Sequence, residues 1–402
     1  MRWAGGRISA GAARRMLDPP AVCPAGSPDA PTWLQSAKST CISPPLQVKF
    51  EGARLASQLD ATPFSPLWLD FAMLARRLTR RHALATSATA LLATGCRPPG
   101  KPSGAVGICF ETLQTAFWEA SYTILKEQLR DRNLPLMEAV ADGDASRQLD
   151  QVQAFIVRRA RGLIVAAKDS VTAVPLVKHA NRAEVPIVFF NRRPHGDSGR
   201  YVAIQSDNFS IARDTVEHMA QVARRRGGAY QAMVLLGDLG DMNAVGRRDG
   251  FLAAIKEHQD IVRVVAQVPT DWNQEKAHAG AAAALAANPG INFVFSSSDF
   301  LFPSLISALQ SANKYRTIDD PGHVILGGFD GDALAYRMLQ ERYLDADGVQ
   351  DLYFECKASI EAVEAAHAPT EPTVVLDRGF VAHQGNLVEC RERMWGARYA
   401  AA

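Results

Sequence analysis

The sequence predicts an α/β protein made of two doubly wound parallel-sheet lobes. From residue 104 onward, short apolar runs bounded by turn residues alternate with longer stretches that have helical spacing. Runs that are apolar throughout indicate strands buried on both faces, as in parallel sheets covered by helices. The alternating units are too numerous for one compact open sheet. An additional short strand in residues 199–205 lies near the midpoint, where a crossover between two halves belongs.

Each expected element follows from its local pattern. Continuous apolar runs predict strands, which in chain order are residues 105–110, 134–140, 162–167, 185–190, 232–236, 261–268, 293–296 and 324–328. Apolar residues three and four positions apart predict helices over residues 117–131, 146–159, 207–224, 244–258, 273–287 and 300–313. In doubly wound sheets ligands bind beyond the carboxyl ends of the strands, so functional side chains are expected directly after strands.

The composition favours a soluble, globular body behind a basic leader. Of the 402 residues, 47% are apolar and 21% are charged, which is typical of folded domains. Residues 1–95 hold 11 Lys and Arg against 5 Asp and Glu, whereas the remaining residues hold 33 against 37. Binding to nucleic acid needs a concentrated basic face, so the mildly acidic body argues against a nucleic-acid partner.

Residues 73–96 carry the features of an export signal in the expected order. Residues 79–84, TRRHAL, resemble the twin-arginine consensus, and an apolar stretch over 83–93 follows. That stretch is too short to span a bilayer as a helix, which needs roughly 20 residues. Residues 93–96, ATGC, resemble a lipobox, so Cys96 is the expected site of lipidation. The alternative is an amphipathic or buried helix that precedes a cysteine.

The segments around this leader have simple interpretations. Residues 97–103 are expected to form a tether, and residues 1–72 a disordered or non-native prefix that holds 9 of the 22 prolines. Because a signal peptide belongs at the N-terminus, we hypothesise that translation starts at Met73; a disordered extension is the alternative. The expected location is the periplasm or the outer face of the cytoplasmic membrane.

The six cysteines have no metal-binding or redox spacing. None of them forms a CxxC pair, so neither a zinc site nor a thioredoxin-like motif is indicated, and no metal site is predicted. Cys109 lies in an apolar run and is expected to be an inert core thiol. Cys356 and Cys390 could pair in an oxidising compartment, but their spacing does not decide it.

Polar and aromatic side chains follow the expected strands in both halves of the body. They are Glu111, Thr115, Phe117, Trp118, Asn191 and Arg192 in the first half, and Arg247, Trp272, Asp299, Asp330 and Gln350 in the second. Each has a structural alternative, since the aromatic residues could belong to the core, the aspartates could cap helices and Arg247 could lie on a solvated helix surface. Their shared position after strands favours a binding site.

The chemistry of these side chains suits a hydroxyl-rich solute. Flat aromatic faces stack on the C–H faces of a sugar ring, and carboxylates and guanidinium groups make strong directional hydrogen bonds to hydroxyl groups. No GxSxG, HExxH or P-loop motif occurs, and no GxGxxG follows a strand. We therefore predict a binding protein with neither enzymatic activity nor a cofactor.

Residues 104–380 resemble the ribose-type (type I) periplasmic sugar-binding proteins, the receptors of ABC sugar importers, which share their fold with LacI-type repressors. Six motifs in order carry the resemblance: the turn ending in Phe117-Trp118, VFFNR at 188–192, RRDGF at 247–251, TDW at 270–272, VFSSSD at 294–299 and ILGGFDG at 325–331. A repressor would need a helix-turn-helix before Gly104, where the export signal lies instead.

The resemblance implies a role for each candidate residue. Phe117, Trp118 and Trp272 would sandwich the ligand, Asn191 and Arg192 would bind it from the first lobe, and Arg247, Asp299, Asp330 and Gln350 from the second. The first lobe would comprise residues 104–206 and 351–370, and the second residues 207–350 and 371–402. Three crossings, near Ser206, Gln350 and Glu371, would form the hinge.

The resemblance also implies partners. These are a small sugar or polyol and an ABC permease in the inner membrane, with the receptor itself a monomer. The alternative is a periplasmic sugar receptor that feeds a sensor kinase or chemoreceptor. Thr115-Ala116 stands where the family often has Asn-Pro, so a hexose, a polyol or a modified sugar is as well supported as a pentose.

Overall fold

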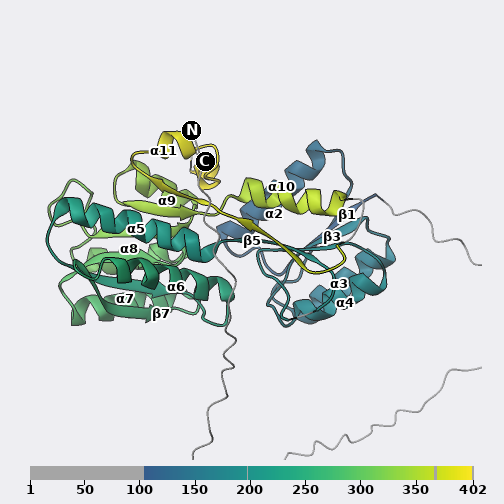
Figure 1. Cartoon of the computed structure of the whole chain (residues 1–402), viewed down its shortest axis with the longest axis horizontal. Coiled ribbons are helices and arrows are strands. Elements are labelled where there is room, and N and C mark those ends of the chain that lie inside the picture. The colour runs from purple at the N-terminus through teal and green to yellow at the C-terminus, as the bar shows by residue number, and fades with distance from the viewer. Residues whose placement is uncertain (1–103, 197, 366–368, 401–402) are drawn as a thin grey trace, which may run out of the picture. The chain divides into compact units, whose positions relative to one another are not determined.

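The first lobe is built on a six-stranded parallel sheet with strand order β11-β5-β4-β3-β1-β2 (Figure 1). The computed structural model describes residues 104–196, 198–365 and 369–400. The expected leader, tether and lipidation site at Cys96 lie outside these residues. The strands are β1 (Val106–Phe110), β2 (Leu136–Val140), β3 (Gly162–Ala166), β4 (Ile187–Phe190), β5 (Val202–Ser206) and β11 (Thr373–Asp377).

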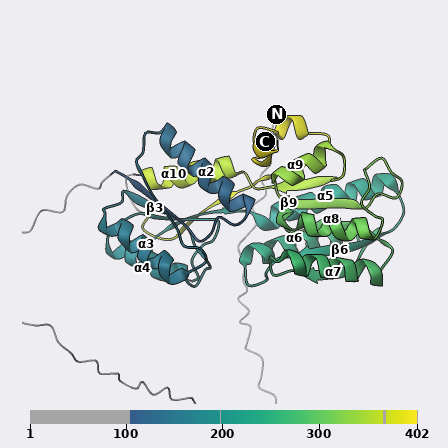
Figure 2. The same cartoon turned by 180° about the vertical axis from the view of Figure 1, so that it is seen from behind.

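Helices cover both faces of this sheet, as Figures 1 and 2 show. One face packs against α2 (Ala116–Asp131) and α10 (Leu352–Glu364), and the other against α3 (Ala145–Val157) and α4 (Ala173–Arg182). β1, β3 and β4 are buried along their whole length. This two-sided burial explains why their sequences are continuously apolar instead of alternating.

Two prolines set the starts of β2 and β4. The strands expected at 134 and 185 begin instead at Leu136 and Ile187, each directly after a proline. Proline has no N–H to donate to a sheet, but its carbonyl still accepts. Val106 N–H donates to the Pro135 oxygen at 2.8 Å, and Leu163 N–H to the Pro186 oxygen at 2.9 Å.

The second lobe repeats this plan with one antiparallel edge. Its sheet has the order β12-β10-β9-β8-β6-β7, in which only β12 runs against its neighbour. The strands are β6 (Tyr230–Leu236), β7 (Val262–Pro269), β8 (Ile291–Ser296), β9 (Ile325–Asp330), β10 (Ala346–Val349) and β12 (Phe380–His383). The predicted class of two doubly wound α/β lobes is thus confirmed.

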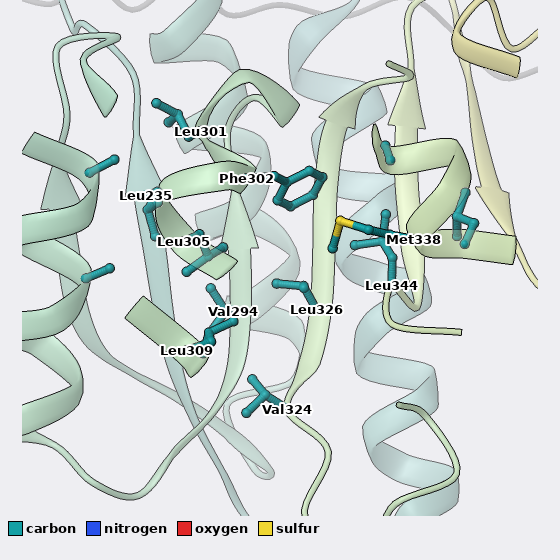
Figure 3. Close-up of a cluster of buried hydrophobic side chains, with 14 of the residues drawn as sticks. Leu235, Val294, Leu301, Phe302, Leu305, Leu309, Val324, Leu326, Met338 and Leu344 are labelled. Carbon is teal, nitrogen blue, oxygen red and sulfur yellow. The ribbon is translucent and has the colours of Figure 1, made fainter. Parts of the chain in front are cut away.

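The second sheet also has two cores. α5 (Asn208–Arg226) and α6 (Met242–Glu257) cover one face. α7 (Gln274–Ala287), α8 (Phe302–Ser311) and α9 (Ala333–Gln340) cover the other. Figure 3 shows Phe302 and Leu305 of α8 beside Val294 of β8 and Leu326 of β9. Burying a side chain such as Phe302 contributes about 2 kcal/mol, so each helix is held mainly by its apolar face.

The chain crosses between the lobes at three places, and the third is not where the sequence analysis put it. The first two crossings follow β5 and β10. β11, which was expected in the second lobe, pairs in parallel with β5 of the first. The predicted crossing near Glu371 is therefore wrong, and the chain crosses after Asp377 instead. The exposed backbone edge of β5 provides the reason, since its N–H and C=O groups need a partner strand.

Asp377 ties the three crossings together. Its carboxylate accepts from the Asp351 N–H and the Gly379 N–H, both at 2.8 Å. Its carbonyl accepts from the Asp207 N–H at 2.7 Å. Burial raises the pKa of Asp377, although these backbone donors favour its ionised form. One residue, through its carboxylate and its carbonyl, therefore holds the hinge segments in register.

The helix caps exclude the alternative roles of Asp299 and Asp330 as capping residues. Asp299 and Asp330 do not cap the helices that follow them. Ser298 caps the short 3₁₀ turn Asp299–Leu301, which precedes α8. Asp332 caps α9 by accepting from the Ala335 N–H at 2.8 Å. Both aspartates are thereby available for other contacts.

The cysteines of the described residues are free thiols. Cys109 and Cys356 lie in cores of the first lobe and Cys390 in a core of the second. Burial raises the pKa of Cys109 to about 12, which keeps it an unreactive thiol. The pairing of Cys356 with Cys390 that was left open does not occur in this structure.

Helix packing in the second lobe leads to a stability prediction at Gly250. A Cβ at this position of α6 would lie 2.3 Å from the Phe209 carbonyl oxygen and 2.9 Å from the Arg213 nitrogen of α5. We expect Gly250→Ala to lower the free energy of unfolding by about 1–3 kcal/mol, because backbone atoms must move apart. Gly246→Ala on the same helix is the control, since its nearest neighbour is a side-chain carbon at 3.1 Å. Equal urea midpoints for the two variants would contradict this packing argument.

Candidate functional site

A cavity of about 350 Å³ lies between residues of the two lobes. Strand ends supply much of its lining: Glu111 follows β1, Asn191 follows β4, Asp330 ends β9 and Gln350 follows β10. Parallel strands bring their carboxyl ends to one edge of each sheet, which places these residues together. The lining comprises Glu111, Thr112, Gln114, Thr115, Ala116, Phe117, Trp118, Asn191, Arg192, Asp241, Asn243, Arg247, Trp272, Ser298, Phe300, Asp330, Asp332, Gln350 and Trp395.

The structure places all but one of the predicted body residues at this cavity. Glu111, Thr115, Phe117, Trp118, Asn191, Arg192, Arg247, Trp272, Asp330 and Gln350 line it. Asp299 does not. Its carboxylate is fully buried and accepts from the N–H groups of Phe329, Gly331 and Asp332 at 2.8–3.0 Å. Asp299 therefore shapes the turn after β9, because these orphan N–H groups need an acceptor, and its assignment as a ligand-binding residue is withdrawn.

A buried ion pair between Arg247 and Asp330 forms the base of the cavity in the second lobe. Arg247 is 5% exposed and Asp330 7% exposed, and Arg247 Nη1 donates to Asp330 Oδ1 at 2.9 Å. The same nitrogen donates to the Ser297 carbonyl, and Nε donates to Asn208 Oδ1, both at 2.8 Å. The guanidinium carbon lies 3.9 Å from the centre of the Phe329 ring, a cation–π arrangement.

Asp330 accepts hydrogen bonds from three side chains. Besides Arg247, the Ser298 hydroxyl donates to its Oδ2, and Gln350 Nε2 donates to its Oδ1 at 2.8 Å. Burial raises the pKa of Asp330, and Arg247 opposes that shift. Removing one partner of such a buried pair leaves an uncompensated charge, at a cost of about 3–5 kcal/mol. Truncating Arg247 or Asp330 would thus test folding as much as binding.

Arg192 forms the corresponding cationic centre in the first lobe. Its Nη1 donates to Glu111 Oε1 at 2.8 Å and to the Lys168 carbonyl at 3.1 Å. Its Nη2 reaches Asp241 Oδ2 of the second lobe at 3.4 Å, and its guanidinium lies 5.1 Å from the Trp118 ring centre. The planar guanidinium thus bridges the two walls of the cavity.

Three side-chain amides connect the lobes beside these charges. Asn243 Nδ2 donates to Asn191 Oδ1 at 2.7 Å, and Asn191 Nδ2 donates to Gln350 Oε1 at 3.4 Å. Asn191 has a φ of 67°, a left-handed conformation that asparagine tolerates better than most residues. The conformation turns the chain directly after β4, so that the amide faces the second lobe.

Aromatic side chains supply the apolar walls. Trp118 is buried and packs edge-on against Phe110 and Phe117, with ring centres 5.9 and 5.0 Å apart. Trp272 lies on the second lobe with its ring centre 5.7 Å from the Arg247 guanidinium. The cavity therefore combines flat apolar faces with fixed charges and amides, the usual composition of a small-molecule site.

Sequence reasoning missed several residues of the lining. Asp241 and Asn243 stand at the start of α6, where Asp241 caps the helix by accepting from the Asn243 N–H at 3.0 Å. Their position after β6 was a signal that could have found them. Trp395 is different, because it comes from a C-terminal segment whose sequence shows no binding pattern.

A cluster of carboxyl groups lies behind the cavity. Neither oxygen of the Asp347 carboxyl has a donor among the described residues. A Cβ placed on Gly328 would lie 2.5 Å from Asp299 Oδ1 and 2.6 Å from Asp347 Oδ1, so the two carboxyls share one small space. Burial and the neighbouring Asp299 raise the pKa of Asp347 well above its ordinary value. Because Asp299 already accepts three N–H groups, we infer that the shared proton resides on Asp347 and is donated to Asp299.

Within the described residues, no cluster of three or more His, Cys, Asp or Glu side chains could hold a metal ion. None of the helices in this described part of the chain is long and apolar enough to cross a membrane.

The fold and the cavity together define a class of protein. Two doubly wound lobes connected by three chain crossings, with a mixed polar and aromatic cavity between them, are the architecture of a two-lobed solute-binding protein. Residues 106–368 match the family model described as periplasmic binding protein domain, and the chain belongs to this family.

The chain matches most of the length of two curated relatives. The chain is 26% identical over 229 residues to the D-apiose import binding protein of Actinobacillus succinogenes, covering 57% of this chain and 70% of that protein. It is 25% identical over 253 residues to the ribose import binding protein RbsB of Escherichia coli, covering 63% of this chain and 80% of that protein.

Solved structures share the fold. A periplasmic solute-binding protein of an ABC transporter from Actinobacillus succinogenes with bound D-allose superposes with a TM-score of 0.64 at 20% identity, covering 72% of this chain and 100% of that one. The myo-inositol-binding protein of Caulobacter superposes with a TM-score of 0.62 at 17% identity, covering 73% of this chain and 98% of that one.

The shared proton gives a prediction with a definite sign. A carboxyl whose pKa is higher in the folded than in the unfolded chain stabilises the protein at low pH and loses that contribution as pH rises. Asp347→Asn keeps the donor and removes the titration. The stability of the variant relative to wild type should therefore increase with pH above about 4, by up to about 1.4 kcal/mol per pH unit. Urea unfolding of both proteins between pH 4 and 8 measures this, and parallel stability profiles would refute the assignment.

Proposed function

We propose that the protein is the extracytoplasmic solute receptor of an ABC importer and binds a compact sugar or polyol between its lobes without altering it. The cavity of about 350 Å³, lined from both lobes by aromatic faces, two arginines, carboxylates and amides, carries the proposal. Its volume lies at the lower end of the range for small-molecule sites, which favours a monosaccharide-sized solute. The import functions named for the relatives support the same class of ligand.

The lining suits hydroxyl groups presented in a ring. Trp118 and Trp272 offer flat faces for C–H groups. Arg192 and Asp330 offer charged hydrogen-bonding groups that are already fixed by their neighbours, so little conformational entropy is lost when the solute binds. A solute that contacts Arg192 of one lobe and Asp330 of the other favours the closed state by its differential affinity.

The hinge is linked to the site by hydrogen bonds. The Ser206 hydroxyl lies 2.6 Å from Gln350 Oε1 and 2.5 Å from Glu355 Oε1. One hydroxyl carries one proton, so if Ser206 donates to Gln350, Glu355 must donate to Ser206. Burial raises the pKa of Glu355 well above its ordinary value, in keeping with a protonated donor. Gln350 in turn donates to Asp330. A solute that binds at Asp330 therefore acts on the hinge through Gln350 and Ser206.

The binding prediction uses Trp272 because its loss creates no buried charge. Purified residues 97–402 should gain thermal stability with at least one member of a panel that includes D-ribose, D-allose, D-apiose, myo-inositol and glycerol, since the solute binds only the folded state. Trp272→Ala should weaken the binding of that solute about 10- to 100-fold by calorimetry, as one stacking face is lost. The solute should be recovered chemically unchanged.

The control is Tyr315→Ala, which removes an aromatic side chain of the second lobe that stacks on Tyr343 away from the cavity. It should lower stability but leave the affinity unchanged. Absence of binding across a broad panel of sugars and polyols would contradict the proposed function. Equal affinities for wild type and Trp272→Ala would remove Trp272 from the site.

For export, we propose cleavage before Cys96 and lipidation of its thiol, in a chain that starts at Met73. Mass spectrometry of the mature protein should find a lipid-modified Cys96 as its first residue. Cys96→Ser should release the protein from the membrane fraction, whereas Cys390→Ser, a buried cysteine of the second lobe, should not. A mature N-terminus upstream of Met73, or membrane retention of Cys96→Ser, would contradict this proposal.

A further inference from the structure

The C-terminal segment, residues 391–400, lies beyond the part of the chain that matches the family model, which ends at 368. Its base is fixed to the second lobe, where Met394 and Ala397 belong to the same core as α8 and α9. Gly396 N–H donates to the Gly331 carbonyl at 3.0 Å. A Cβ on Gly396 would lie 2.1 Å from the Asp332 carbonyl carbon, so only glycine allows this close approach to the turn after β9.

The same segment contacts the first lobe through several side chains. Arg393 Nε donates to Asp351 Oδ2, at the start of α10, at 3.0 Å, and Trp395 and Arg398 make the other contacts. The Trp395 ring lies 6.4 Å from the Phe117 ring, edge to face, within the core that also contains Trp118. Arg398 donates two hydrogen bonds to Glu127 of α2, from Nη1 to Oε2 at 2.6 Å and from Nη2 to Oε1 at 2.8 Å. The C-terminal segment is thus packed into the second lobe and bonded to the first.

Trp395 also forms part of the cavity itself. It is 1% exposed and lines the cavity beside Phe117 and Asp330. Its indole Nε1–H donates to the Asp330 carbonyl oxygen at 2.8 Å, which fixes the ring next to the residue that holds the buried ion pair. Tryptophan combines a large apolar face with one polar donor, and here the donor orients the face.

We infer that the C-terminal segment is a clasp across the two lobes, and that Trp395 is a ligand-binding residue that closes one wall of the cavity. The inference rests on the proposed function for the ligand, whereas the clasp itself is a property of the chain. Trp395 restricts the cavity to compact solutes, and the Arg398–Glu127 pair slows opening and thereby release of the solute.

The expected size of each effect follows from burial. Arg398 and Glu127 have side-chain exposures of 48% and 28%, so solvent screens the pair, and its loss should raise the dissociation rate only about 2- to 5-fold. Trp395 is buried, so Trp395→Ala should weaken binding about 10- to 100-fold. It should also admit solutes larger than those bound by wild type, because the wall is gone. Trp395→Phe keeps an aromatic wall and should lose much less affinity.

The test is a double-mutant cycle read by stopped-flow dissociation of the tightest-binding sugar or polyol of the panel. Arg398→Ala, Glu127→Ala and the double variant should raise the dissociation rate by the same factor, since either truncation breaks the one pair. Arg342→Ala is the matched control, because Arg342 is as exposed as Arg398 and makes a bidentate pair with Asp319 inside the second lobe. It should leave the dissociation rate unchanged.

Gly396→Ala is an independent test, since its Cβ would push the C-terminal segment away from the Asp332 backbone without removing a contacting side chain. It should raise the dissociation rate at least as much as Arg398→Ala. Dissociation rates equal to wild type in Arg398→Ala and Gly396→Ala would overturn the clasp, and unchanged affinity and solute range in Trp395→Ala would overturn the binding role of Trp395.

If wild type binds no member of the panel, the proposed function fails and the assignment of Trp395 to a ligand fails with it. The clasp is then tested by small-angle scattering of the full chain. A larger radius of gyration in the Arg398→Ala/Glu127→Ala variant than in wild type and Arg342→Ala supports the clasp, and equal radii overturn it.

Discussion

The buried pair of Arg247 and Asp330 is the interaction on which the rest of the site depends. Charges this deeply buried persist only when the remaining donors and acceptors are satisfied, and here Asn208, Ser298 and Gln350 do so. These partners come from the start of α5, the turn after β8 and the segment after β10. Satisfying one ion pair therefore fixes the edge of the second sheet and the beginning of the hinge at once. The solute meets groups that are already oriented.

The link from this pair to the hinge gives the site its mechanism. Gln350 contacts Asp330 on one side and Ser206 on the other, and Asp377 holds the three crossings together. A movement of one lobe against the other must pass through these few residues. Because they are buried and hydrogen-bonded, intermediate positions would leave polar groups unpaired, which costs about 1–3 kcal/mol for each group. The hinge thus favours discrete states over a continuous range.

The contacts between the lobes differ in strength according to burial. Exposed pairs such as Arg398 with Glu127 contribute about 0.2–1 kcal/mol at most, whereas the aromatic and amide contacts around the cavity are removed from water. The clasp alone is too weak to hold the lobes closed against the entropy of opening. A bound solute that adds several desolvated hydrogen bonds and stacking faces decides the balance. The clasp then tunes the lifetime of the closed state.

The sequence by itself determined the two α/β lobes, because strands buried on both faces must be continuously apolar and their helices amphipathic. It also determined that Asp330 and Gln350 would meet, because each stands at the carboxyl end of a parallel strand, with Arg247 in the first turns of the helix that follows β6. Tertiary structure alone decided that Asp299 serves backbone N–H groups, that β11 joins the first sheet and that Trp395 reaches the cavity. These outcomes depend on which backbone edges and orphan N–H groups remain unpaired once the chain has folded, and no local pattern records that.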